Sequence, residues 1–144
     1  MEAKYLDVEA AMTVWNKIEE IDLDSLTPVS HERLFLSEFA KALRPALRKL
    51  GLTNRMVGVQ VPNYSMASTI SVVVPNVMPK YDYRTIKALS PEAQESYFAE
   101  MRELDAHRRD ACRKMSQIVL RLFPACDNRS DPMIDWFDAR FSCY

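Results

Sequence analysis

Residues 56–74 read MVGVQVPNYSMASTISVVV, and this stretch decides the fold. It holds two short aliphatic runs joined by a polar tip. In each run alternate residues share one face, because strand side chains alternate with a period of two. These residues are Val57, Val59, Val61, Ile70, Val72 and Val74. Pro62 ends the first run, since proline cannot donate to a strand ladder. The pattern predicts a β-hairpin over residues 56–74.

Helical patterns flank the hairpin on both sides. Apolar residues recur at spacings of three and four over residues 7–20, 30–50 and 90–123. Asp7 and Ser90 suit N-cap positions, and Gly51 suits the end of the second helix because it tolerates positive φ. Pro45 lies inside that second helix, so we expect a kink or a split near Arg44.

The third helical pattern is unusually long. A helix over 90–123 would measure about 50 Å at 1.5 Å per residue, longer than a domain of this size is wide. Its middle, ELDAHRRDACRK, is charged on nearly every face, and Arg108 stands where the apolar stripe would continue. Either the helix breaks near His107, or its first half projects from the body and meets a partner. A homodimer through this helix is one such arrangement.

Residues 134–143 alternate apolar and polar side chains and predict one more strand, antiparallel to the hairpin. The expected fold is therefore a single α+β domain over residues 1–144. It contains a three-stranded antiparallel sheet packed by helices, one of them long and charged.

Composition limits the classes of function. The chain has 144 residues, 19 basic and 20 acidic, so no overall field draws it to nucleic acid or anionic lipid. No apolar run approaches the roughly 20 residues that span a bilayer. The first residues lack the pattern of a secretion signal, so we expect a cytoplasmic protein, with no membrane partner.

Motifs for catalysis or cofactors are missing from the sequence. Two glycines cannot build a phosphate-binding loop, and the three cysteines and two histidines lack metal-ligand spacing. We therefore expect no enzyme, no catalytic residues, no metal and no cofactor. An enzyme using scattered carboxylates and His107 is kept as a third alternative, which an ordered metal beside His107 would favour.

Candidate contact residues collect in two connecting segments and on the charged helix. Aromatic and methionine side chains in such segments suit a binding surface, although they also suit the cover of a sheet edge. The candidates for partner binding are Tyr64, Met66, Met78, Tyr81, Tyr83, Arg108, Arg109 and Arg113.

Several short segments resemble a small domain found in large polyvalent proteins of phages and other mobile elements. The matching segments are ALRPALRK from Ala42, GVQV, PNYSMAST, ISVVV, and RSDPMIDWFDARF from Arg129. The resemblance covers roughly residues 40–75 and 127–144 and implies two helices on a three-stranded antiparallel sheet. This chain adds an N-terminal helix and the long charged helix. The family supplies no catalytic residues to carry over.

The resemblance implies an accessory protein of a mobile element, acting in the host cytoplasm. Our first hypothesis is a non-enzymatic protein that binds and inhibits a host protein, for instance a defence component, as an anti-CRISPR protein does. The alternative is a nucleic-acid-binding accessory protein whose affinity falls steeply with salt. Its phosphate contacts would be Arg44, Arg48, Lys49, Arg55, Arg108, Arg109, Arg113 and Lys114.

Overall fold

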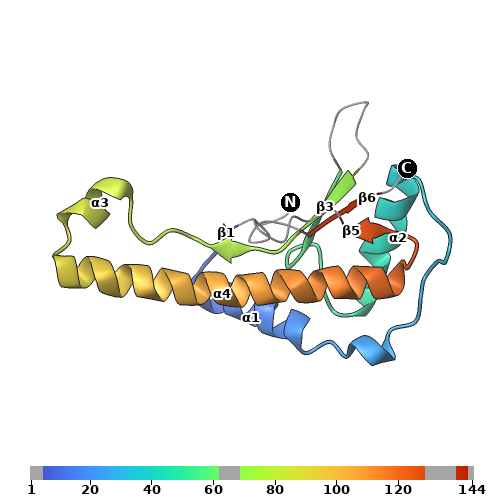
Figure 1. The fold of residues 1–144 in the computed structure, drawn as a ribbon, viewed down its shortest axis with the longest axis horizontal. Coiled ribbons are helices and arrows are strands. Elements are labelled where there is room, and N and C mark those ends of the chain that lie inside the picture. The colour runs from blue at the N-terminus through green and yellow to red at the C-terminus, as the bar shows by residue number, and fades with distance from the viewer. Residues whose placement is uncertain (1–4, 62–68, 129–138, 143–144) are drawn as a thin grey trace.

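The computed structural model describes residues 5–61, 69–128 and 139–142, and its longest element is the helix α4, Pro91–Leu122 (Figure 1). The side chain of Ser90 accepts a hydrogen bond from the N–H of Ala93, so the predicted N-cap is confirmed. The helix runs without a break through His107. Of the two alternatives drawn from the sequence, the continuous helix is the one observed.

The two halves of α4 differ in how they are covered. From Arg108 onward, buried side chains recur every three or four residues. Between Pro91 and Leu104, all of which the structure describes, Tyr97 is the one buried side chain. In Figure 1 this first half extends past α1 and the sheets, with α3 folded over its end. We refer to it as the projecting half of α4.

The first helix, α1, spans Val8–Glu19 and lies along α4 (Figure 1). Asp7 is its N-cap, as predicted, and accepts a hydrogen bond of 2.8 Å from the N–H of Ala10. Trp15 is buried and its Nε1 donates to the carbonyl of Pro75 at 2.9 Å. A short 3-10 turn, Leu23–Ser25, follows the helix.

The second helix, α2, spans Leu36–Lys49, so the predicted start at residue 30 is wrong by six residues. The preceding segment is held in a non-helical form by contacts remote in sequence. The N–H of Val29 donates to the carbonyl of Leu122 at 2.8 Å, and the Ser30 hydroxyl accepts from the N–H of Glu32. The bond from Val29 anchors this segment on the end of α4, and the chain takes up helical backbone only at Leu36.

Helix α2 is not split at Pro45, contrary to one of the two expectations. Proline removes the donor for the carbonyl of Lys41, and that residue is exposed, so water can serve the carbonyl instead. The helix ends at Gly51, which has a φ of 84°. The N–H groups of Gly51 and Leu52 donate to the carbonyls of Arg48 and Leu47, the pattern of a Schellman cap.

The main sheet is antiparallel throughout, with the order β2-β3-β6-β5. Its strands are Gly58–Gln60, Thr69–Val73, Ala139–Ser142 and Asp127–Asn128 for β2, β3, β6 and β5. The hairpin and the pairing of the C-terminal strand beside it are confirmed. The predicted number of three strands in this sheet is wrong, because the short strand β5 adds a fourth. Residues 62–68, 134–138 and 143 of the predicted elements lie outside the described residues.

A second sheet pairs β1, Tyr5–Leu6, in parallel with β4, Asn76–Val77. The sequence did not predict it, because a strand of two residues shows no alternation. The connection after the hairpin also contains a short helix, α3, Tyr83–Ala88, capped by Asp82. The mixture of helices and separate antiparallel strands confirms the α+β class.

The core lies where α1, α2 and the second half of α4 meet the main sheet. Phe39 of α2 packs against Phe123, which follows α4, with ring centroids 4.9 Å apart. Val57 and Val59 are buried, whereas Val61, expected on the same face, is exposed. Arg108 is buried too, and its Nε and Nη2 donate to the carbonyl of Val74 at 3.1 and 2.8 Å.

Candidate functional site

Aromatic side chains meet beside the projecting half of α4. The rings of Tyr81 and Tyr97 lie 5.1 Å apart between centroids, and those of Tyr97 and Phe98 lie 5.7 Å apart. We call these three residues the tyrosine cluster. The segment that carries Tyr81 also holds the helix at Gln94, whose Nε2 donates to the carbonyl of Leu89 at 3.1 Å. The cluster itself is held by the packing of its rings.

Phe98 of the cluster and two further large side chains of the connection before α4 are exposed. The exposed fraction is 70% for Tyr83, 58% for Met78 and 43% for Phe98. Lysines cover two of the rings, with Lys80 Nζ 5.3 Å from the Tyr81 centroid and Lys87 Nζ 4.7 Å from that of Tyr83. Three of the predicted contact residues, Met78, Tyr81 and Tyr83, therefore lie in one connection, along the projecting half of α4.

A hollow of about 400 Å³ opens between the β1–β4 sheet and α4. We call it the tyrosine hollow. Its lining residues are Tyr5, Asn76, Val77, Pro79, Tyr97, Met101, Leu104 and Asp105. Six of these eight side chains are apolar or aromatic, and Asp105 contributes the one ionised group. Its Oδ2 lies 2.8 Å from Nη2 of Arg109, four residues later on the helix.

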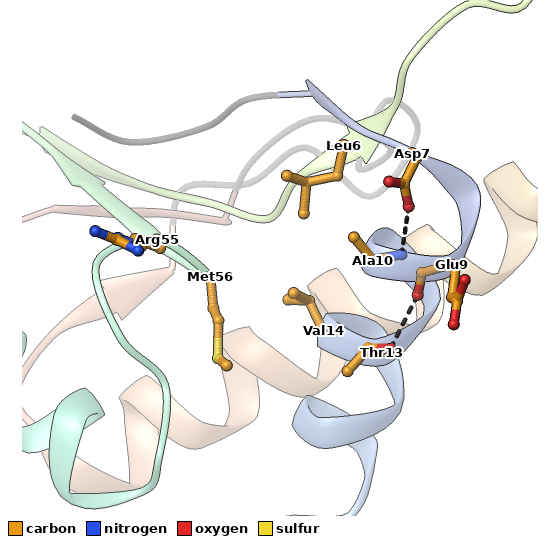
Figure 2. A pocket seen from close by; sticks show the side chains of 8 residues that line it. All are labelled: Leu6, Asp7, Glu9, Ala10, Thr13, Val14, Arg55 and Met56. Atoms are coloured by element: carbon orange, nitrogen blue, oxygen red, sulfur yellow. Dashed lines mark hydrogen bonds between the residues drawn. The ribbon is translucent and has the colours of Figure 1, made fainter.

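The two residues of strand β1 line different hollows, and Figure 2 shows the second of these. Tyr5 lines the first hollow and Leu6 the second, because successive strand residues point to opposite sides. The second hollow measures about 450 Å³ and is lined by Leu6, Asp7, Glu9, Ala10, Thr13, Val14, Arg55 and Met56.

The polar groups of the second hollow serve the start of α1. Figure 2 shows Asp7 accepting from the Ala10 N–H and the Thr13 hydroxyl donating to the Glu9 carbonyl. The guanidinium of Arg55 points away from the other labelled side chains in this view. The groups that could orient a ligand are therefore engaged within α1 or turned outward.

The three arginines predicted as contacts occupy different environments. Arg108 is 6% exposed and donates to the carbonyl of Val74, so it is unavailable as a surface contact and the prediction is corrected here. Arg109 and Arg113 lie on the surface of α4 and form ion pairs with Asp105 and Asp110. Tyr64 and Met66 lie outside the described residues.

Three of the basic residues considered for phosphate binding are directed to backbone carbonyls. Arg44 Nη2 donates to Val59 at 3.0 Å, and Lys114 Nζ donates to Glu19 at 3.0 Å. Arg108 is the third. Arg48, Lys49 and Arg55 are exposed.

Among the described residues, the carboxyl groups of Glu19 and Asp82 have shifted pKa values. Burial raises the pKa of Glu19, an effect that Lys114 opposes and Asp110 reinforces. The pKa of Asp82 is lowered by hydrogen bonds from the backbone and then the side chain of Thr85. Asp82 caps the helix that begins with Tyr83, so its ionisation bears on the position of that ring.

Other kinds of site were sought in the described part of the chain. Among the residues placed by the structure, no three or more histidine, cysteine or acidic side chains are grouped so as to hold a metal ion. Within 5–61, 69–128 and 139–142, no helix is both long and apolar enough to cross a bilayer. Cys112 and Cys126 are buried thiols.

Sequence reasoning missed part of the site. Tyr5, Tyr97 and Phe98 were not among the predicted contacts, and Asp105 was taken only as one of the carboxylates on the charged helix. Searches of protein-family models, of curated proteins and of solved structures find no match to this chain.

Proposed function

We propose that this chain is a non-enzymatic protein that binds another protein through the tyrosine cluster and the neighbouring side chains of Met78 and Tyr83. The observation that carries the proposal is the group of exposed aromatic and methionine side chains along the projecting half of α4. In line with the resemblance to mobile-element proteins, we further propose that the partner is a host protein that this chain inhibits. A component of a defence system, such as a CRISPR effector, is the first candidate.

The composition of the surface supports protein binding. Aromatic residues and methionine are enriched at the centres of protein interfaces, where they lose contact with water on binding. Met78, Tyr83 and Phe98 lie away from the main core, so their exposed area is not needed for folding. Tyr81 and Tyr97 hold the cluster in place, which limits the entropy lost on binding.

The nucleic-acid alternative has less support. Binding along phosphates requires several cations directed outward on one face. Here Arg44, Arg108 and Lys114 donate to carbonyls of the same chain, and Arg109 and Arg113 pair with aspartates. The alternative remains an outcome of the experiment below.

The first experiment captures partners with tagged protein from a host lysate, with and without nuclease. We expect a stoichiometric host protein that survives nuclease and resists 0.5 M salt, roughly the ionic strength at which exposed charge pairs are largely screened. Recovery of nucleic acid, with proteins lost after nuclease, would favour the alternative and reject the proposal.

A variant pair ties the captured partner to this surface. The test variant carries Met78→Ala, Tyr83→Ala and Phe98→Ala. The control carries Val29→Ala and Phe35→Ala, which remove exposed apolar side chains from the segment between α1 and α2. We expect the test variant to raise the dissociation constant for the captured protein by at least about 30-fold. This is the effect of losing one hot-spot residue that contributes about 2 kcal/mol. The control should change it less than about threefold. Equal effects would reject this surface as the site.

A further inference from the structure

We propose that the tyrosine hollow receives an arginine side chain of the partner protein. The inference rests on the proposed function in one respect only, that the partner is a protein. The hollow itself, with its apolar floor, two tyrosine rings and one carboxylate, is a feature of this chain. Each of these parts matches a part of an arginine side chain.

The floor matches the stem of the arginine. Val77, Met101 and Leu104 are half-buried and line the hollow. Arginine lays its three methylene groups along apolar surface while its charged head stays at the edge. A hollow of about 400 Å³ has room for one such side chain and neighbouring backbone of the partner.

The rings match the guanidinium. Tyr5 is exposed and Tyr97 is held by its contact with Tyr81, and both line the hollow. A cation within about 6 Å of a tyrosine face is attracted by the ring, and arginine adds planar stacking that lysine lacks. Cation–ring contacts already occur nearby, where Lys80 and Lys87 lie over Tyr81 and Tyr83.

The carboxylate of Asp105 supplies the charge. It is partly exposed, and Oδ2 is bonded to Arg109. A carboxylate has about four acceptor positions, so a second guanidinium can bind beside the first. The group that would orient the ligand is therefore fixed by an existing ion pair.

The surrounding charge favours a cation. Residues 91–105 contain five acids and one base, a net charge of −4. The preceding segment, residues 79–90, contains three bases and one acid, and Arg109 pairs with Asp105, which leaves a net charge of −1 for the two segments and Arg109 together. Opposite charges across an interface speed association and disfavour partners of like charge. An acidic side chain is accordingly a poor occupant.

The test uses nuclear magnetic resonance of ¹⁵N-labelled protein titrated with N-acetylarginine methylamide. The matched probe is N-acetylcitrulline methylamide, which has nearly the same shape and no charge. We expect the arginine probe to shift amides of residues 76–79 and 97–105 with millimolar affinity. The citrulline probe should bind at least about fivefold more weakly, because it loses the cation–ring and ion-pair terms.

Two variants locate the effect. Asp105→Asn removes the carboxylate of the hollow, and Asp110→Asn removes another ion-paired carboxylate of α4 outside it. Both change the net charge equally. We expect a loss of affinity for the arginine probe of about fivefold with Asp105→Asn and less than twofold with Asp110→Asn. Matching thermal unfolding curves show that both variants fold.

Equal binding of the two probes, equal effects of the two variants, or no shifts near the hollow would each overturn the inference. Equal probe binding would assign the hollow to an apolar group instead. None of these outcomes rejects the proposed function if the triple variant of Met78, Tyr83 and Phe98 still fails to bind the captured protein. Failure of that capture experiment, with the arginine titration positive, would reject the proposed function alone.

Discussion

Arg108 offers the sharpest test of how this fold is held together. The sequence placed Arg108 on a charged helix and made it a candidate for partner binding. In the structure Arg108 is buried, and its guanidinium donates two hydrogen bonds to the carbonyl of Val74. Those bonds join the middle of α4 to the residue that follows β3. Arg108→Ala should therefore reduce the free energy of unfolding.

The magnitude follows from what the substitution leaves behind. A hydrogen bond from a charged group contributes about 1.5–3 kcal/mol, and a buried carbonyl without a donor costs about 1–3 kcal/mol. The lost stem adds a packing term, and relaxation of the structure around the vacated space offsets some of the total. We expect a loss of about 3 kcal/mol. For a chain of this length the melting temperature should fall by roughly 6–12 °C.

Urea unfolding followed by circular dichroism measures this loss. Arg113→Ala is the matched control, since Arg113 lies on the same helix, is exposed and pairs with Asp110. It should change the free energy of unfolding by less than about 0.5 kcal/mol. A loss below about 1 kcal/mol for Arg108→Ala, or equal losses for the two variants, would refute the structural role given to Arg108.

Three further predictions concern single side chains elsewhere. Trp15→Phe should lower the free energy of unfolding by about 2 kcal/mol in urea titrations, since it leaves a void and a carbonyl without its donor; an unchanged midpoint would contradict the packing described. Gly51→Ala should cost about 1 kcal/mol by the same assay, because alanine is strained at a φ of 84° and its Cβ would lie 2.9 Å from Cε of Lys17. Asp82, whose pKa is held below its ordinary 3.8 by Thr85, stabilises α3 fully above that pH. Amide chemical shifts of residues 83–88 should therefore lose helical character as the pH falls below 3.8, and Asp82→Asn should shift this transition.

The sequence predicted the features that depend on neighbouring residues. Asp7 and Ser90 cap their helices because a cap needs only a side chain and N–H groups two or three residues away. Gly51 ends α2 for an equally local reason. The pairing of β2 with β3 followed from the alternation in residues 56–74.

Features that depend on remote residues were missed. The segment before α2 is anchored by a bond from Val29 to Leu122, which no pattern near Val29 reveals. The sheet of β1 and β4 joins residues about 70 apart, and each strand is too short to show a period. The tyrosine hollow was missed for the same reason. Tyr5 lines it beside Tyr97 because β1 pairs with β4. Arg108 was visible as a charge on the apolar stripe, but its partner at Val74 was not.

The order of strands in the main sheet has a consequence for synthesis on the ribosome. The strand β6, which is made last, lies between β3 and β5. A nascent chain that has reached only residue 128 can form α1, α2 and the hairpin, but β5 then has no neighbour in the sheet. Strand pairing between residues far apart in the sequence is slow, because the entropy cost of closing the loop comes before the stabilising contacts form. A product that ends before residue 139 would expose the edge of β3, and such an edge invites pairing between chains.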